Sequence, residues 1–202
     1  MHDLVSVILA SASPRRYELL TSLGLNVVVR PSGVDEGDRP GHGPRELAAL
    51  HAAAKAAAVA RGEISAVIVA ADTVVDLDGV SLGKPRTMAE AASMLRALSG
   101  REHLVHTAYT VADVPSGRRI AGLLTTRVQF ARLSEDVIAT YVASGDPMDK
   151  AGSYGIQGRG AALVERIDGD FHTVMGFPLG DFVRRLPELG YALPPPPLVP
   201  AA

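Results

Sequence analysis

The segment Ser11-Ala12-Ser13-Pro14-Arg15-Arg16 has the residue types of a turn that binds phosphate. The apolar run Val5–Leu9 before it predicts a buried strand, and Tyr17–Gly24 after it predicts a helix that ends at a glycine. Ser13 suits the N-cap of that helix and Pro14 its first position. The free N–H groups and the dipole at a helix start attract anions. The two arginines oppose this dipole, so their placement favours phosphate binding over helix stability.

A carboxylate follows the next buried strand, which the apolar run Ala66–Ala71 predicts. Asp72 directly after this run would lie at the carboxyl end of a strand, where α/β folds place ligands. It could bind a divalent cation or accept a proton from water. The alternative is that Asp72 starts a turn and caps a backbone N–H. Further on, Lys84 in Gly83-Lys84-Pro85 offers a compact positive charge, or is a solvated surface residue.

The glycine-rich loop Gly145–Gly158 carries a second group of polar side chains. Lys150 can reach an anion, and Gln157 can read the edge of a nucleobase because its amide both donates and accepts. A loop of this length in a compact domain is more often functional than not, and the alternative is an ordinary linker.

Two isolated charges and the histidines are weaker candidates. Glu36, in the loop Pro31–Gly43, is a candidate second metal ligand or a solvated acid. Lys55 stands alone in an alanine-rich run, where it either meets substrate or extends to the surface. The histidines show no metal-binding pattern, because His103 and His106 would lie on opposite faces of one strand. A core or surface position is expected for His51 as well.

The predicted elements alternate between strands and helices and then form a long hairpin. Further helices are predicted at Pro44–Ala60, Thr87–Leu98, Ser134–Ala143 and Pro178–Leu186. Further strands are predicted at Asn26–Arg30, at Val74–Leu77 and Val80–Leu82 around Asp78-Gly79, and at His103–Asp113 and Arg118–Leu133. Ala161–Ile167 and Phe171–Met175 flank a further turn, Asp168-Gly169-Asp170. This order predicts an α/β fold with a mixed sheet. Residues 1–190 are expected to form a single domain, and residues 191–202 a proline-rich extended or disordered tail.

The composition excludes several classes of protein. The chain has 202 residues, 47% of them hydrophobic, and a net charge of −2, so no general nucleic-acid or membrane surface is expected. It has no cysteine, which excludes disulfides, thiol nucleophiles and cysteine zinc sites and fits a reducing compartment. No signal peptide or transmembrane span is recognised, so a cytoplasmic location is expected.

Taken together, these segments resemble the Maf family of nucleoside triphosphate pyrophosphatases. The resemblance covers nearly the whole chain, from about residue 5 to residue 186, and the order and intervals of its segments make it specific. The segments that match are Leu9–Arg16, Ala71-Asp72-Thr73, Gly83-Lys84-Pro85 and Asp149–Gly158, with weaker matches at Leu95–Gly100 and Asp168–Leu179.

The resemblance implies an elongated α/β fold related to the inosine-triphosphate pyrophosphatases. It further implies a mixed sheet with flanking helices, two lobes around a central cleft, and a homodimer. The implied reaction cuts the α–β phosphate bond of a nucleoside triphosphate, giving the monophosphate and pyrophosphate with Mg²⁺ or Mn²⁺. The run Lys150–Gln157 is similar to the branch that acts on dTTP and UTP. Roles in nucleotide-pool sanitation and in cell division arrest also go with the family.

The resemblance assigns roles to single residues. It makes Asp72 the proton acceptor and links Arg15, Thr73 and Gln157 to substrate choice. Two departures are Ser153, where alanine is common, and the glycine-rich stretch Gly37–Gly43, which makes the placement of Glu36 uncertain.

The chemistry of the reaction suggests roles for the remaining candidates. Asp72, with Glu36, would bind the metal. Arg16 and Lys84 are expected to be catalytic by holding phosphate charge, and the groups expected to bind the substrate are Ser11, Ser13, Lys55 and Lys150. Three rivals stay open: a phosphatase or nucleotidyltransferase with the same cations, a non-catalytic nucleotide-binding regulator of septum formation, and an interaction protein that docks through its proline-rich tail.

Overall fold

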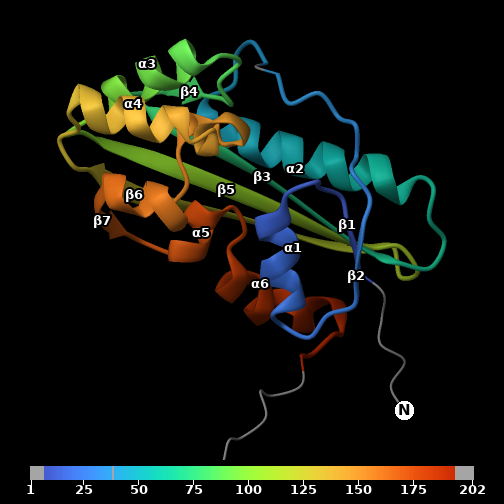
Figure 1. Cartoon of the computed structure of the whole chain (residues 1–202). Coiled ribbons are helices and arrows are strands. Elements are labelled where there is room, and N and C mark those ends of the chain that lie inside the picture. The colour runs from blue at the N-terminus through green and yellow to red at the C-terminus, as the bar shows by residue number, and fades with distance from the viewer. Residues whose placement is uncertain (1–6, 38, 194–202) are drawn as a thin grey trace, which may run out of the picture.

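A computed structural model describes residues 7–37 and 39–193, and one mixed sheet of seven strands organises them (Figure 1). The strand order is β2-β1-β3-β5-β6-β7, with β4 paired to β3. β2 and β3 run parallel to β1, whereas the other pairs are antiparallel. The strands are β1 (Val7–Leu9), β2 (Val27–Val29), β3 (Val67–Leu77), β4 (Val80–Leu82), β5 (Glu102–Asp113), β6 (Arg118–Phe130) and β7 (Val164–Asp168). The predicted mixed α/β sheet is confirmed.

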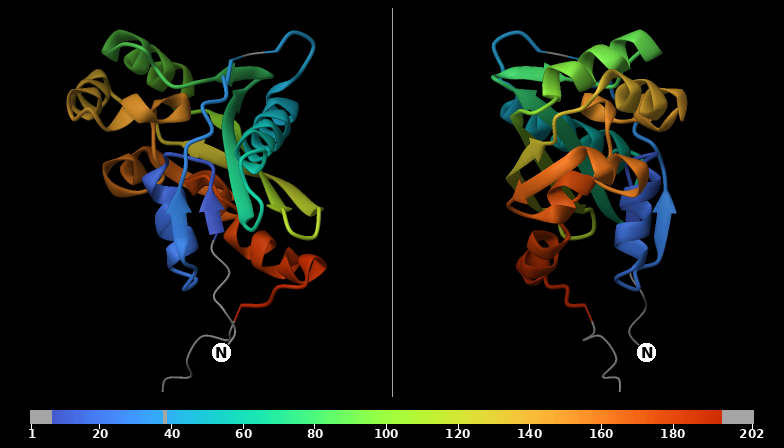
Figure 2. Two further views of the ribbon diagram at one scale, coloured as in Figure 1. Left: turned by 90° about the vertical axis from the view of Figure 1, so that its right-hand side faces the viewer. Right: turned by 60° about the vertical axis from the view of Figure 1, so that its left-hand side comes forward.

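Helices cover both faces of this sheet. The helices are α1 (Pro14–Thr21), α2 (Pro44–Ala60), α3 (Met88–Leu98), α4 (Glu135–Ala143), α5 (Phe171–Met175) and α6 (Leu179–Arg185). α2 lies along one face against β3 and β5, and the others lie on the opposite side of the sheet (Figures 1 and 2). Ser13, Thr87 and Ser134 cap α1, α3 and α4 as predicted. Short 3₁₀ turns occupy 146–149, 151–153, 158–163 and 186–189.

The side chains of β3 alternate between two faces and divide the core. On one face, Val67, Val69 and Ala71 belong to an apolar cluster with α1 and α6. Further along the same face, Val75 and Leu77 belong to a second cluster with α3 and α4. The alternation therefore leaves the polar side chain of residue 73 between the two clusters. The even-numbered residues face α2, whose small alanines allow a close approach.

The predicted end of a strand at Ala71 is wrong, because β3 continues through Asp72 to Leu77. Its ladder with β5 is unbroken from Val67 opposite Asp113 to Asp76 opposite Leu104. Pairing with a distant strand thus overrides the local turn signal of two polar residues, and Asp72 starts no turn. The hairpin at Asp78-Gly79 is confirmed, with φ angles of 55° and 85°.

The other edge of β3 is open where Asp72 and Thr73 lie. β1 pairs with β3 only as far as Val69, and β4 pairs with it only from Val75 onward. Between these points no described strand contacts this edge. The carboxyl ends of the parallel strands β1 and β2 lead into the gap, which is where sheets of this kind bind ligands.

Three smaller outcomes complete the comparison with the predicted elements. β6 ends at Phe130, before the predicted limit of Leu133. The segment Phe171–Met175 is a helix whose first turn is capped by Asp170, which accepts a hydrogen bond from Thr173 N. The predicted tail at residues 191–202 starts too early, because Tyr191 and Leu193 pack against the first core cluster, and its remaining residues, 194–202, lie outside the described residues. Within 7–37 and 39–193, no helix is long and apolar enough to span a membrane.

Candidate active site

A cavity of about 440 Å³ opens at the free edge of β3. Its charged lining consists of the five cationic residues Arg15, Arg16, Lys55, Lys84 and Lys150 and the three carboxylates Glu36, Asp72 and Asp149. This excess of positive charge favours a polyanion. Another part of the wall is apolar and is formed by Val75, Val105, Ile156, Val174 and Met175. The cavity therefore joins a charged wall to a surface suited to a flat organic ring.

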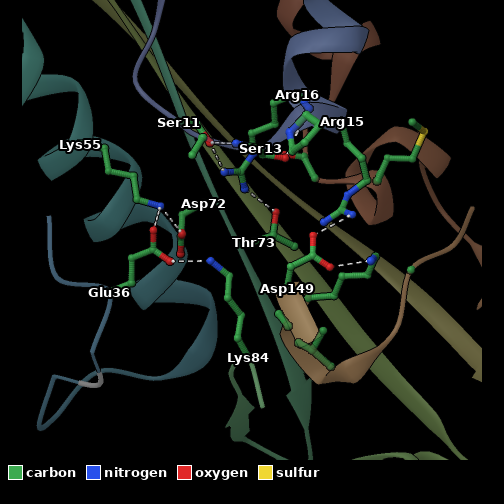
Figure 3. Close-up of a pocket in the computed structure, with 18 of the residues that line it drawn as sticks. Ser11, Ser13, Arg15, Arg16, Glu36, Lys55, Asp72, Thr73, Lys84 and Asp149 are labelled. Atoms are coloured by element: carbon green, nitrogen blue, oxygen red, sulfur yellow. Dashed lines mark hydrogen bonds and ion pairs between the residues drawn. The ribbon is translucent and has the colours of Figure 1, made fainter. Parts of the chain in front are cut away.

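Lys55 connects the two carboxylates that the sequence proposed as metal ligands. Its Nζ lies 2.7 Å from Asp72 Oδ1 and 2.7 Å from Glu36 Oε1, and Lys84 Nζ lies 3.7 Å from the other oxygen of Glu36. Figure 3 shows these side chains pointing toward one another. Lys55 is buried, so the alternative prediction that its side chain extends to the surface is wrong.

His51 is a member of this cluster that the sequence reading left out. Its Nδ1 lies 3.1 Å from Asp72 Oδ2, and its Nε2 lies 3.2 Å from the carbonyl oxygen of Gly37. His51 and Lys55 stand one turn apart on the buried stripe of α2. The signal available in the sequence was this i, i+4 spacing of two polar residues on an alanine-rich face.

Arg16 is a fixed part of the wall. Its guanidinium donates to Ser11 Oγ at 3.1 Å, to Thr73 Oγ1 at 3.1 Å and to the carbonyl oxygen of Gly176 at 2.8 Å (Figure 3). Gly176 has a φ of 111°, a conformation that favours glycine, and so can turn this carbonyl toward the arginine. Three of the five guanidinium N–H groups are thereby engaged, which leaves two to meet a ligand.

The cations on the far side of the cavity are paired with aspartates. Arg15 Nη1 lies 3.6 Å from Asp149 Oδ2. Lys150 Nζ donates to Asp149 Oδ1 at 2.6 Å and to both the carboxylate and the carbonyl oxygen of Asp146. The three hydrogens of the Lys150 ammonium thus all have acceptors in the neighbouring residues Asp146 and Asp149, so Lys150 stabilises this loop.

The two residues proposed to read the base lie in different surroundings. Thr73 lines the cavity, but its hydroxyl is engaged with Arg16 and with Thr107 Oγ1 at 3.0 Å. Gln157 is exposed and lies outside the cavity lining, next to Ile156, which is part of it. The fold brings ten of the predicted site residues to one cavity and leaves Gln157 at its margin. The ten residues are Ser11, Ser13, Arg15, Arg16, Glu36, Lys55, Asp72, Thr73, Lys84 and Lys150.

Comparison with known proteins shows which family the chain is related to. The family model described as Maf-like protein matches residues 6–189. The chain belongs to the Maf family. A relative from Methanosarcina barkeri named dTTP/UTP pyrophosphatase is 45% identical over 93% of this chain and 95% of its own length. Another of that name, from Moorella thermoacetica, is 49% identical over 86% and 89%. Among solved structures, the Staphylococcus aureus Ham1 protein has a TM-score of 0.45 and 15% identity over 62% of this chain and 72% of its own.

In the cavity of this Maf-family chain, burial and neighbouring charges act on the pKa of Glu36 and on that of Arg16. Burial raises the pKa of Glu36, but the hydrogen bond and charge of Lys55, with Lys84 and Arg16, outweigh burial and hold that pKa below its usual value. Burial lowers the pKa of Arg16, whereas the charges of Asp72 and Glu36 raise it. An arginine stays protonated despite such a shift. The wall thus keeps a permanent positive charge beside Asp72.

The carboxylate oxygens in the cavity of this Maf-family chain are suitable ligands for a hard divalent cation. Glu36 and Asp72 reach the same ammonium group from two sides, so their oxygens already converge on one positive charge. Magnesium is commonly bound by one or two carboxylates together with substrate phosphates. In the part of the chain that the structure describes, no cluster of three or more histidine, cysteine or acidic side chains forms a self-sufficient metal site.

Proposed function

We propose that this chain is a nucleoside triphosphate pyrophosphatase that hydrolyses dTTP and UTP to the monophosphate and pyrophosphate. The observation that carries the proposal is the buried Asp72 at the open edge of β3, facing a cavity with five cationic side chains. The relatives named dTTP/UTP pyrophosphatase share 42–49% of their residues with this chain, which supports the same activity here.

In the proposed reaction, a water oxygen attacks the α-phosphorus while the bond from that phosphorus to the α–β bridging oxygen breaks. Asp72 accepts the proton of the water, and pyrophosphate leaves with the bonding electrons. Arg15, Arg16 and Lys84 hold the phosphates, because phosphoryl transfer depends mainly on positioning and charge. Ser11 and Ser13 belong to the same wall.

Asp72 and Glu36 would hold a divalent cation, Mg²⁺ or Mn²⁺, which neutralises phosphate charge and lowers the pKa of a bound water. When the cation binds, the Lys55 ammonium has to move away from at least one of these carboxylates or share its oxygens with the cation. Its long, flexible side chain allows this movement.

The base is proposed to lie on the apolar wall formed by Val75, Val105 and Val174. Gln157 would read its edge by hydrogen bonds, which requires the loop around residues 155–158 to close over the cavity. Thr73 would contribute to substrate choice through its contact with Arg16.

The remaining expectations are part of the same proposal. We propose a homodimer in the cytoplasm, where triphosphates are abundant and where the absence of cysteine is unremarkable. No contact with polymeric nucleic acid is proposed. A role in nucleotide-pool sanitation or in cell division arrest would follow from this activity.

The deciding experiment is product identification on a panel of natural and modified triphosphates with magnesium and with manganese. Monophosphate and pyrophosphate, formed fastest from dTTP and UTP, support the proposal. Orthophosphate in place of pyrophosphate indicates a phosphatase. Tight nucleotide binding without turnover indicates the non-catalytic regulator.

A further inference from the structure

His51 lies at the junction between the two carboxylates of the site. It is 2% exposed, and both of its ring nitrogens face oxygen acceptors. One acceptor belongs to Asp72 on β3, and the other is the carbonyl of Gly37, which follows Glu36 in the loop after β2. A single side chain on α2 therefore contacts the segments that carry both carboxylates.

The Asp72 carboxylate is held at both oxygens from the same helix. Lys55 Nζ meets Oδ1 at 2.7 Å, and His51 Nδ1 meets Oδ2 at 3.1 Å. With Lys55 alone, the carboxylate could rotate about its Cβ–Cγ bond and keep its partner, because a flexible ammonium follows a moving oxygen. The rigid imidazole removes this freedom and fixes which oxygen edge faces the cavity.

A second histidine–aspartate pair on the same face of β3 provides a comparison. His106 Nε2 lies 3.1 Å from Asp76 Oδ2, and the buried His106 also contacts Thr125. Neither His106 nor Asp76 lines the cavity of about 440 Å³. The two pairs thus have similar burial and bonding, and only the pair at Asp72 adjoins the charged wall.

We propose that His51 is a positioning residue for the reaction: through Nδ1 it orients the Asp72 carboxylate, and through Nε2 it contacts the loop that carries Glu36. The proposal rests on the proposed function, since it assigns Asp72 to proton transfer. His51 itself touches no substrate. Its loss should reduce turnover and leave the cationic phosphate wall, and hence substrate binding, intact.

Two amide variants separate the two hydrogen bonds. In His51→Asn, the side-chain nitrogen takes the place of Nδ1 and can still donate to Asp72. In His51→Gln, it takes the place of Nε2 and can donate only to Gly37. We expect kcat of His51→Asn to stay within about 3-fold of wild type, and that of His51→Gln to fall by about 10-fold or more, the size seen when a second-shell partner is lost. KM and the affinity for an α,β-methylene triphosphate should change by less than about 3-fold in both.

The control is His106→Asn, whose amide takes the place of Nδ1 and so loses the contact of Nε2 with Asp76. This variant disrupts the other buried pair and should lower stability without lowering kcat. Equal kcat values for the Asn and Gln variants of His51, or a fall in affinity that matches the fall in kcat, would overturn the proposal. Should His51→Gln fail to fold, ¹⁵N NMR of the wild type replaces it: a hydrogen on Nδ1 supports the proposal, and a bare Nδ1 overturns it. The product made by the wild type tests the proposed function separately.

Discussion

The ammonium of Lys55 lies 2.7 Å from a carboxylate oxygen of Asp72, and both side chains are more than nine-tenths buried. The same ammonium lies 2.7 Å from Glu36. Two carboxylates that converge in this way would repel each other without the cation between them. The charge balance of the site therefore depends on one side chain of α2.

Replacing that side chain should destabilise the protein. In Lys55→Met, the buried Asp72 loses its cation, and we expect the free energy of unfolding to fall by about 3 kcal/mol. Urea denaturation measures this loss. Added Mg²⁺ should raise the melting temperature of the variant more than that of the wild type, because the ion would take the place of the ammonium. Lys84→Met is the control, since Lys84 is mostly exposed and should cost less than about 1 kcal/mol. If Lys55→Met and Lys84→Met lost the same free energy of unfolding, Lys55 would not be the cation that balances the buried carboxylates.

Asp72→Asn tests proton transfer directly. Because the amide has the size of the carboxylate but is not a base, we expect kcat for pyrophosphate release to fall by about 10² to 10⁴, with the fold retained. Asp76→Asn is a matched control, because Asp76 points to the same face of β3 and also pairs with a histidine. Near-normal turnover of Asp72→Asn with magnesium would remove Asp72 from this role.

The parts of the fold that were predictable depend on neighbouring residues. The Ser13-Pro14 helix start, the capped start of α3 and the Asp78-Gly79 hairpin are each fixed by a few adjacent side chains, and all three are confirmed. The sequence does not reveal the continuity of β3 through Asp72, because it depends on pairing with β5, where Asp72 lies opposite the distant Ala108. Local signals cannot report such a partner.

In the site, too, the sequence indicates single residues but not the contacts between distant segments. The sequence pointed to Lys55 and Asp72 separately, but only the packing of α2 on β3 shows that they touch. The sequence alone predicts an ordinary core or surface position for His51, because its partners, Asp72 and Gly37, come from two other segments. Lys150 was expected to hold phosphate, and the aspartates that surround it are visible only once its turn is formed.

We expect Asp149 to compete with a substrate phosphate for Arg15. Its carboxylate lies 3.6 Å from Arg15 Nη1, at an edge of the guanidinium that a phosphate would also use. Pairs of this exposure are worth up to about 1 kcal/mol, so Asp149→Asn should lower KM by up to about 5-fold at low ionic strength with kcat unchanged. Asp168→Asn removes the 4.0 Å contact with the exposed Arg127 outside the cavity, which keeps its contact with Glu102, and should leave KM unchanged. A KM for Asp149→Asn at or above the wild-type value would show that Asp149 does not compete.

Gln157 is proposed to choose the base, although it lies at the margin of the cavity. Gln157→Ala should therefore change the ranking of triphosphates more than the turnover of the best one, because in the proposed complex the amide would contact only the base. Steady-state kinetics on the nucleotide panel measures this ranking. An unchanged ranking would mean that Gln157 stays exposed when the nucleotide binds and does not contact the base.

His103 should make the protein less stable in acid, independently of the active site. Burial lowers the pKa of His103 to about 4, and its Nδ1 is buried without a hydrogen-bond partner among the described residues. Above pH ~6.5 both the folded and the unfolded chain hold this imidazole neutral. As the pH falls from there to about 4, only the unfolded chain takes up the proton, so stability is lost in this window and not below it. The expected loss is about 3 kcal/mol.

Urea denaturation at several pH values measures this loss, and His103→Gln should abolish it because the amide does not titrate. Tyr154→Phe is the control. It removes the hydroxyl that lies 2.7 Å from His103 Nε2 but keeps the aromatic ring that buries the imidazole. Since burial is the cause of the shift, Tyr154→Phe should retain the dependence on pH between 6.5 and 4. If Tyr154→Phe lost this dependence as fully as His103→Gln, the hydrogen bond rather than burial would control the titration of His103.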